Sequence, residues 1–131
     1  MLPPTSTRVS DHTSDRINEK IREQTEQNIR DCATRGTIAI NKRLSELDRE
    51  WDIERTLEAN AASLALIGLG LGTFISKKWY ILPAVVSGFL LQHALQGWCP
   101  PVPIFRRRGV RTAEEIHAEK YALKALRGDF E

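Results

Sequence analysis

The chain has 131 residues, of which 27% are charged, and its formal net charge at pH 7 is only +2. This length suffices for one domain with its own core. The near balance of charge argues against a nucleic-acid-binding protein, so we expect no nucleic-acid partner. Cys32 and Cys99 are far apart and lack the spacing and neighbours of a zinc site. We expect two free thiols, no metal and no cofactor.

The N-terminal part of the chain divides at about residue 14. Residues 1–13 mix Pro, Ser, Thr and Asp without periodicity, which predicts a disordered tail. Residues 14–58 are charged and amphipathic, which predicts cytoplasmic helices with a break near Gly36. The apolar face of the first helix comprises Ile17, Ile21 and Ile29, and that of the second comprises Ile40, Leu44, Leu47 and Trp51.

Charged residues almost vanish from the middle of the chain. Within residues 59–105 only Lys77 and Lys78 are charged. Residues 59–76 and 79–98 are each long enough to cross a hydrocarbon core of about 30 Å, because a helix rises about 1.5 Å per residue. The first stretch also lacks the polar face that a soluble helix needs. The pattern predicts an all-α membrane protein with a two-helix transmembrane hairpin, flanked by amphipathic cytoplasmic helices.

The basic residues predict how this hairpin is oriented. Lys and Arg are enriched on the cytoplasmic flanks of membrane spans. Eight of them flank the hairpin and only two lie in its turn, so we expect both termini on the cytoplasmic side. The flanking residues are Lys42, Arg43, Arg49, Arg55, Arg106, Arg107, Arg108 and Arg111.

Residues 99–131 predict a basic linker followed by an amphipathic helix. Thr112 and Glu115 have the spacing of a capping box, in which each side chain accepts a hydrogen bond from the other residue's backbone amide. The helix is expected over residues 113–127, with Gly128 at its C-terminal cap. The side chains expected to contact anionic headgroups at the bilayer surface are Arg106, Arg107 and Arg108.

Small residues follow one face of the first span. In lipid, small side chains let helix backbones approach closely, and van der Waals packing then drives association. We expect this face to pack on the second span or on another copy of the chain, and we favour self-association into a homo-oligomer. The residues concerned are Ala61, Ala65, Gly68 and Gly72 in the first span and Ala84 and Gly88 in the second.

Two features near the end of the second span could carry chemistry. Gln92, His93 and Gln96 are intramembrane polar residues, and such groups often mark an interhelical hydrogen bond or a functional site. We expect hydrogen bonding rather than an ion pathway, because a single histidine without an intramembrane carboxylate is a poor relay. Cys99 precedes two prolines that must end the helix, so its thiol is expected at the cytoplasmic interface. It could be structural, or it could react as a sulfur carrier, a redox sensor or an acylation site.

Four short motifs in the hairpin and its flank form a pattern. They are Ile53-Glu54-Arg55-x-Leu57, the glycines Gly68, Gly70 and Gly72, Pro83 with Ser87-Gly88-Phe89-Leu90-Leu91, and Gly97-Trp98-Cys99-Pro100. In this order and spacing they resemble the YgaP-like inner-membrane domain family of bacteria, whose members are two-helix membrane segments. The resemblance covers about residues 52–130, and it implies the bacterial inner membrane as the location. Some members carry a rhodanese domain that handles persulfide sulfur, but none fits the charged, helical N-terminal half, so sulfur transferase activity is not implied.

These features together predict a non-enzymatic integral membrane protein. It would self-associate through its hairpin and present its cytoplasmic helices to itself or to an unidentified membrane or cytoplasmic protein. Two alternatives belong to other classes of protein. The chain could be a sulfur-handling or redox accessory that acts through Cys99, or a subunit of a small-solute or ion pathway formed by several hairpins.

Overall fold

The computed structural model describes residues 2–130, and all regular elements in that range are helices. The long helices are α2 (Asp15–Arg35), α3 (Thr37–Arg49), α4 (Ile53–Phe74), α5 (Ile81–Gln96) and α7 (Ala113–Arg127). The short ones are α1 (Arg8–Asp11), the 3₁₀ turn η1 (Lys77–Tyr80) and α6 (Pro101–Arg107). The prediction of an all-α protein is confirmed.

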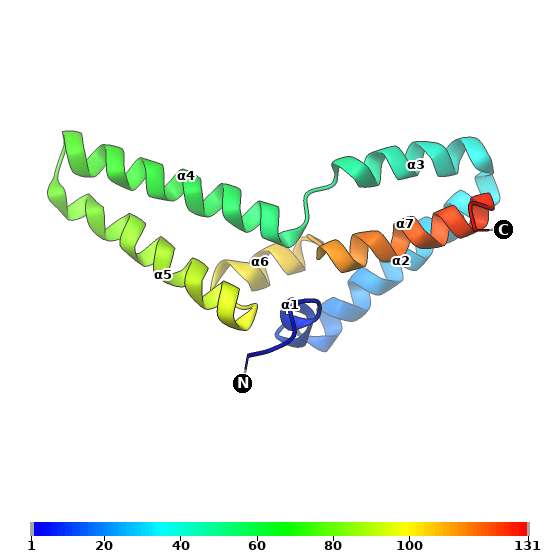
Figure 1. The fold of residues 1–131 in the computed structure, drawn as a ribbon, viewed down its shortest axis with the longest axis horizontal. Coiled ribbons are helices and arrows are strands. Elements are labelled where there is room, and N and C mark those ends of the chain that lie inside the picture. The colour runs from blue at the N-terminus through cyan, green and yellow to red at the C-terminus, as the bar shows by residue number, and fades with distance from the viewer. Residues whose placement is uncertain (1, 131) are drawn as a thin grey trace.

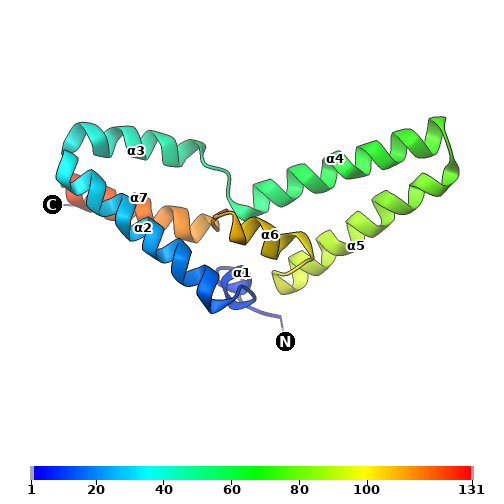
Figure 2. The same ribbon diagram turned by 180° about the vertical axis from the view of Figure 1, so that it is seen from behind.

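The helices form two arms that meet at the centre of the molecule (Figure 1). The hairpin arm consists of α4, η1 and α5, with α4 and α5 antiparallel. The bundle arm consists of α2, α3 and α7, which pack on one another. The short helices α1 and α6 lie between the two arms, and Figure 2 shows that α2 and α3 diverge from their connection toward the centre.

Local signals in the sequence explain where several helices begin and end. Asp52 caps α4, because its Oδ1 accepts a hydrogen bond of 2.8 Å from the Arg55 amide. The predicted capping box of α7 is confirmed: the Thr112 amide donates to Glu115 at 2.8 Å, and the Glu115 amide donates to the Thr112 hydroxyl at 3.2 Å. Gly36, with a φ of 90°, supplies the left-handed backbone that lets α2 turn directly into α3.

Two apolar clusters stabilise the fold, one within the bundle arm and one between the two arms. The bundle cluster lies between α2, α3 and α7, and the central cluster lies where the arms meet. Burial of one such side chain contributes roughly 1.5–3 kcal/mol to the stability of the fold. Because the central cluster contains residues of α1, α4 and α6, it attaches the base of the hairpin arm to the two short helices. The bundle cluster contains Cys32, Ile40, Leu44, Leu47, Ile116 and Leu123. The central cluster contains Val9, Ile53, Leu57, Cys99 and Val102, with Phe105 and Val110 packed against it.

The structure corrects three segment boundaries predicted from the sequence. Residues 8–11 of the expected tail form α1, because Val9 is buried in the central cluster. The expected boundary between residues 58 and 59 lies inside α4, which runs without interruption from its cap. The expected basic linker contains α6, which begins at Pro101, where proline is favoured because its missing amide would have no partner.

The predicted apolar face of α3 is right at three positions and wrong at one. Ile40, Leu44 and Leu47 are buried in the bundle cluster. Trp51 is 46% exposed, because α3 ends at Arg49 and the chain is extended before α4 begins. Its ring instead stacks on the guanidinium of Arg55, 4.5 Å from the ring centre.

Among residues 2–130, one helical stretch, Thr37–Phe74, is long and apolar enough to cross a membrane by length and composition alone. Its apolar part lies in α4. α5 has 16 residues, fewer than the roughly 20 that cross a bilayer as one straight helix. The antiparallel hairpin is thus a feature of the fold, with one candidate span.

Candidate functional site

Two glycines of α4 allow close helix contact near the tip of the hairpin arm. Gly68 lies against Leu82 and Pro83, and a Cβ added at Gly68 would come within 2.5 Å of the Pro83 Cδ. Gly72 lies against the ring of Tyr80, where an added Cβ would come within 2.6 Å of Cδ1. A side chain at either position would push α4 away from η1 and α5. This face therefore serves the contact between two helices of one chain.

The other small residues predicted for this face behave differently. Ala61 and Ala65 are half-buried on α4. Ala84 is exposed, and a Cβ at Gly88 would meet no atom within 4 Å. Both residues were expected in the contact, and both lie outside it. The reason is helical geometry, since at about 100° per residue they lie roughly 100° and 140° further around α5 than Pro83.

A polar cluster of Arg8, Glu54 and His93 lies at the base of the hairpin arm. The Nε2 atom of His93 lies 2.8 Å from Glu54 Oε2, and Arg8 Nη2 donates to Glu54 Oε1 at 2.7 Å. Burial alone would raise the pKa of the Glu54 carboxyl, but the hydrogen bond to His93 and the charges of His93 and Arg8 hold that pKa below its usual value. His93 is 2% exposed, and its Nδ1 has no hydrogen-bond partner among residues 2–130.

Arg8 reaches this cluster because α1 packs on the end of α5. Gly97 has a φ of 76°, and an added Cβ would lie 2.5 Å from the carbonyl carbon of Arg8. This contact could not be predicted from the sequence, since Arg8 and Glu54 are separated by 46 residues and belong to segments expected to be unrelated.

The three polar residues of α5 do not form the predicted set of interhelical bonds. Gln92 donates to Gln96 at 3.5 Å along the same helix. Within the described chain, His93 alone of the three bonds across to α4, and its partner Glu54 lies in the first turn of that helix. His93 therefore lies at the level of the charged groups at the hairpin base.

Cys99 is packed in the central cluster and is only 3% exposed. Burial raises the pKa of its thiol, the hydrogen bond with the Val102 backbone lowers it, and the charge of Glu54 raises it, with a net rise. A reactive cysteine needs a lowered pKa and access to solvent, so neither property favours a reactive thiol here. α1 and α6 cover this position, which favours a structural thiol, and the expected location of Cys99 at the cytoplasmic interface stays a prediction. Cys32 is likewise buried, and burial raises the pKa of its thiol.

The three consecutive arginines of α6 and its end have different environments. Arg106 is 1% exposed and donates to both carboxylate oxygens of Glu115, at 2.5 and 3.0 Å. It also donates to Asn18 at 2.9 Å. Arg107 and Arg108 are exposed. The predicted contact with headgroups is thus wrong for Arg106, whose guanidinium instead joins α2, α6 and α7.

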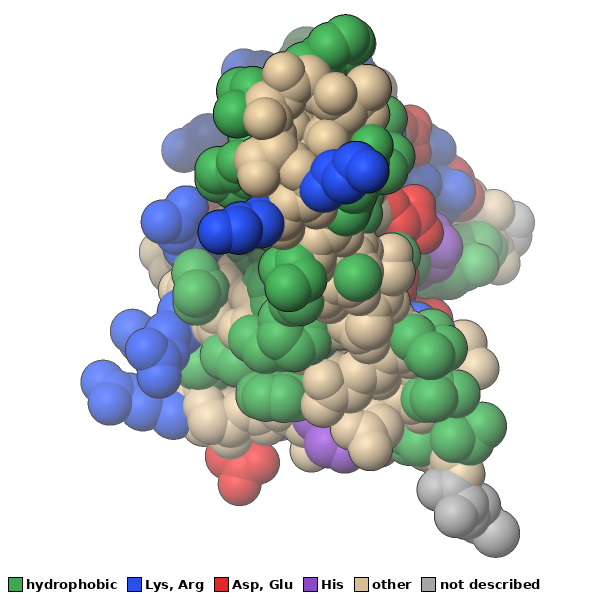
Figure 3. All heavy atoms as spheres, turned by 90° about the vertical axis from the view of Figure 1, so that its left-hand side faces the viewer, with side chains coloured by type: hydrophobic (Ala, Val, Ile, Leu, Met, Phe, Trp, Pro, Cys, Tyr) green, Lys and Arg blue, Asp and Glu red, His purple; other side chains and the backbone are tan. Residues whose placement is uncertain are grey.

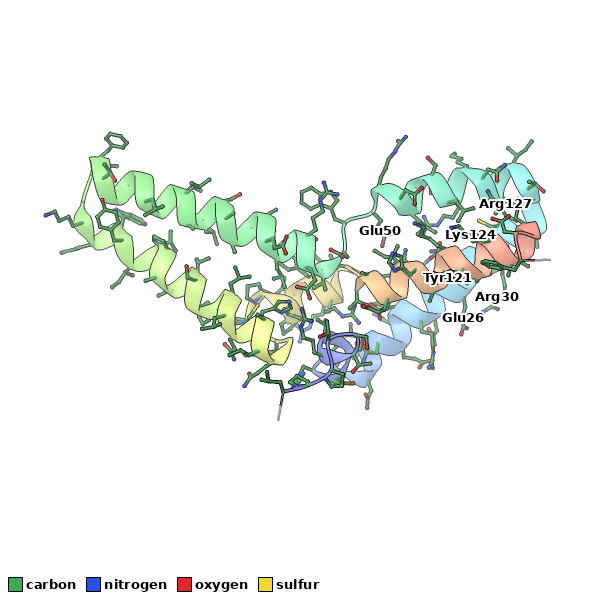
Figure 4. The ribbon with its side chains drawn as sticks, viewed as in Figure 1. Glu26, Arg30, Glu50, Tyr121, Lys124 and Arg127 are labelled. Atoms are coloured by element: carbon green, nitrogen blue, oxygen red, sulfur yellow. The ribbon has the colours of Figure 1, made fainter. Side chains whose placement is uncertain are left out.

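A second buried ion network centres on Glu119 of α7. Its side chain is fully buried and accepts from Arg43 Nε at 2.6 Å, from Arg111 Nη1 at 2.7 Å and from Asn28 at 3.2 Å. Arg111 also forms a bidentate pair with Glu50, at 2.7 and 2.8 Å. Figure 4 labels Glu50 at the end of α3 nearest α4. Burial would raise the pKa of Glu119, but the hydrogen bonds from Arg43, Arg111 and Asn28 hold it below its usual value.

Sequence reasoning missed this network, although one signal was available. Glu119 lies three residues after Ile116 and four residues before Leu123, on the face that packs into the bundle cluster. A charged residue at such a position indicates a buried partner, because an unpaired buried charge is very costly.

A cleft of about 980 Å³ opens where α2 and α3 diverge. Its walls are α2 between Ser14 and Thr25, the end of α3 with Trp51, and the segment 106–111 that connects α6 to α7. These three segments can be followed in Figure 2. The lining is rich in arginine and lysine, so the cleft is a strongly basic concave surface.

No group of three or more His, Cys, Asp or Glu side chains in residues 2–130 is placed to hold a metal ion. What the arrangement can do is bind an anion at the cleft and fasten the hairpin base through ion pairs. Comparison with family models, with curated proteins and with solved structures finds no match to this chain. The resemblance to the YgaP-like domain stays a prediction.

Proposed function

We propose that the chain is an integral membrane protein, in which the hairpin arm inserts into the bilayer and holds the bundle arm at the cytoplasmic surface. There it acts as a non-enzymatic anchor or accessory subunit. The observation that carries the proposal is the apolar surface of the hairpin arm. Leu66, Phe74, Ile81 and Leu91 are between 60% and 87% exposed, and green apolar side chains cover much of the view from the hairpin end in Figure 3. Soluble monomers rarely expose an apolar surface of this extent.

The dimensions of the hairpin arm support insertion. The segment of α4 from Leu57 to Phe74 is about 26 Å long at 1.5 Å per residue. η1 and α5 run beside it in the opposite direction, so the 3₁₀ turn lengthens the return path. The hydrocarbon core is about 30 Å thick, and the bilayer can thin locally to match a slightly shorter hairpin. Lys77 and Lys78 at the tip could reach the far headgroups with their long side chains.

The polar cluster of Arg8, Glu54 and His93 supports the proposed cytoplasmic boundary. Ionised groups are costly inside lipid, so this cluster marks the level at which the hairpin leaves the hydrocarbon. Exposed Arg107 and Arg108 lie beyond that boundary in the chain, which favours the cytoplasmic side for the base and for both termini. With the resemblance to a bacterial family, we propose the bacterial inner membrane as the location.

Labelling of single new thiols tests both insertion and orientation. The variants are Lys78→Cys at the hairpin tip and Arg107→Cys at the base, and both positions are exposed. The natural Cys32 and Cys99 are buried and should give little background. In intact bacterial cells, a membrane-impermeant maleimide should label K78C and spare R107C, and permeabilised cells should show both labelled. The chain should also resist extraction by alkaline carbonate.

Two results would contradict the proposal. Labelling of R107C but not K78C in intact cells would mean that the hairpin has the opposite orientation. Release of the chain by carbonate would mean that the hairpin is not inserted.

The burial of Cys99 gives no support to the sulfur-handling or redox alternative, and no described feature favours a solute or ion pathway. Self-association remains a prediction. Any second copy would have to use a surface other than the Gly68 and Gly72 contact, which η1 and α5 already cover.

A further inference from the structure

The basic cleft is the strongest unassigned site in the molecule. We propose that it binds the phosphate group of an anionic phospholipid headgroup. Phosphate oxygens are favoured ligands of arginine and lysine, because charge-assisted hydrogen bonds are stronger than neutral ones. The proposal goes beyond membrane anchoring, since it gives the bundle arm a ligand of its own.

Four cations of the cleft have no anionic partner among residues 2–130. They are Arg16 and Lys20 on α2 and Arg107 and Arg108 at the end of α6, and all four are exposed. None of them forms an ion pair within the part of the chain that the structure describes, whereas the neighbouring Arg22 pairs with Glu19. Their charges are therefore available to a ligand. Figure 3 shows Lys and Arg side chains gathered along one side of the molecule as seen from the hairpin end.

The lining offers little negative charge to compete with an anion. Glu50 is the only carboxylate among the described lining residues, and both oxygens of Glu50 accept hydrogen bonds from Arg111 at 2.7 and 2.8 Å. Arg43, Arg106 and Arg111 also line the cleft, but they already form ion pairs within the chain. Their three partners are Glu50, Glu115 and Glu119. The net potential inside comes from the four unpaired cations.

The shape of the cleft favours an amphiphile over a free phosphate ion. Its volume of about 980 Å³ is much larger than one phosphate group needs. Ile17, Trp51 and Val110 add apolar surface beside the cations. A headgroup with the beginning of its acyl chains presents both kinds of surface.

The position of the cleft also favours a lipid. Arg107 and Arg108 follow the apolar stretch that ends at Trp98, and α6 packs on the base of α4. The cleft is thus joined directly to the hairpin base, where the headgroups of an inserted molecule would lie. The choice of a lipid rests on the proposed insertion, whereas attraction for phosphate follows from the cleft alone.

Binding is tested on the purified full chain in an uncharged detergent, so the result does not depend on insertion. The probes are dioctanoyl phosphatidylglycerol, dioctanoyl phosphatidylcholine and glycerol 3-phosphate. We expect phosphatidylglycerol to bind about tenfold more tightly than either of the others, and its affinity to fall as salt is added.

The variant R16Q/K20Q removes two unpaired cations from the cleft. It should weaken phosphatidylglycerol binding by about tenfold, because each lost charge-assisted contact contributes substantially. The matched control is R35Q/K42Q, which removes the same charge from exposed positions outside the cleft and should change the affinity by less than about twofold. The helical circular dichroism should be unchanged in both.

Three results would overturn the proposal. Equal affinities for phosphatidylglycerol and phosphatidylcholine would mean that the cleft does not recognise the net negative charge of the lipid. Glycerol 3-phosphate binding as tightly as phosphatidylglycerol would assign the cleft to free phosphate esters instead of lipid. An equal loss in R16Q/K20Q and R35Q/K42Q would mean that general surface charge, and not this cleft, attracts the lipid. A failure of membrane insertion would be seen separately, in the carbonate extraction.

Discussion

Buried charge makes the bundle arm sensitive to the loss of single residues. Glu119 is fully enclosed, and two guanidinium groups and an amide saturate its oxygens. Such a network contributes little net free energy compared with a well-packed apolar core, because its charges lose their hydration on folding. Removal of one partner is different, since it leaves an uncompensated charge in a dry environment. The bundle arm therefore depends on Glu119 more than its position in a polar helix suggests.

We predict that Glu119→Gln lowers the free energy of unfolding by about 3 kcal/mol, because Arg43 and Arg111 lose their shared carboxylate. The control is Glu114→Gln on the same helix, where an exposed carboxylate without a hydrogen bond among residues 2–130 is neutralised. It should change stability by less than about 0.5 kcal/mol. Chemical unfolding of the solubilised chain, followed by circular dichroism, measures both. Equal effects of the two variants would contradict the importance of the network.

The same carboxylates predict the pH dependence of stability. The pKa of Glu119 lies below its ordinary value of 4.5 in the folded chain, and so does that of Glu115. Burial would raise the pKa of Glu115, but the hydrogen bonds from Arg106 and Thr112 and the charge of Arg106 together lower it. A lowered folded-state pKa stabilises the fold above the unfolded value, and this stabilisation is lost as the pH falls through the folded value. We expect the free energy of unfolding to drop below about pH 4.5. In E119Q, the slope of the free energy of unfolding against pH should be smaller by up to about 1.4 kcal/mol per pH unit.

E114Q again supplies the comparison for the pH experiment. Its acid slope should match that of the natural chain more closely than the slope of E119Q does. An E119Q slope identical to the natural one would show that this carboxylate does not titrate differently in the folded and unfolded states.

Among the elements, the hairpin arm depends on close approach at Gly68. We predict that Gly68→Ala destabilises the hairpin by about 1–3 kcal/mol, because the new methyl group would overlap Pro83. Gly70→Ala in the same helix is the control. A Cβ there meets no atom within 4 Å, and alanine favours helix over glycine by up to about 1 kcal/mol. Thermal unfolding in detergent should move in opposite directions for the two variants.

Crosslinking of the same samples separates packing within the chain from self-association. If G68A kept its stability but lost a crosslinked dimer, the glycine face would serve a second copy and the contact with Pro83 would be unimportant. Loss of stability with unchanged crosslinking agrees with the structure.

How far each element could be predicted depends on the range of the signal that specifies it. The bounds of α7 could be read from the sequence, because its capping box and its terminal glycine act within a few residues. The hairpin could be read from the gap in charge. α1 and α6 could not, because each is stabilised by the central cluster, which joins residues from three separate stretches of the sequence.

The candidate sites could likewise be predicted only where the signal lies within a few residues of the sequence. Gly68 could be singled out from helical spacing, but its partner Pro83 required the structure. The pairing of His93 with Glu54 spans 39 residues, and the basic cleft combines three segments whose positions depend on the whole fold. Charge alone could not distinguish buried Arg106 from exposed Arg107.

At the scale of the whole molecule, Arg111 joins the two arms. Its carbonyl oxygen accepts from the Ile53 amide at 2.7 Å, at the first residue of the hairpin arm. Its guanidinium pairs with Glu50 and Glu119 and donates to Thr25 at 3.1 Å. One residue thus links the start of α4 to all three helices of the bundle arm. The orientation of the bundle arm relative to an inserted hairpin depends on this junction.

We predict that Arg111→Lys loosens the junction and leaves both arms folded. Lysine keeps the charge but cannot form the bidentate pair with Glu50 while it contacts Glu119. Loss of one such charged contact corresponds to roughly 10–100-fold faster local opening. Hydrogen exchange of the full chain in nanodiscs should therefore accelerate by that factor at residues 50–53 and 111–112, while the middle of α4 around Gly68 keeps its protection. Arg108→Lys, at an exposed position, should leave both regions unchanged. Faster exchange throughout α4 in R111K would instead mean that the arms do not fold independently of their junction.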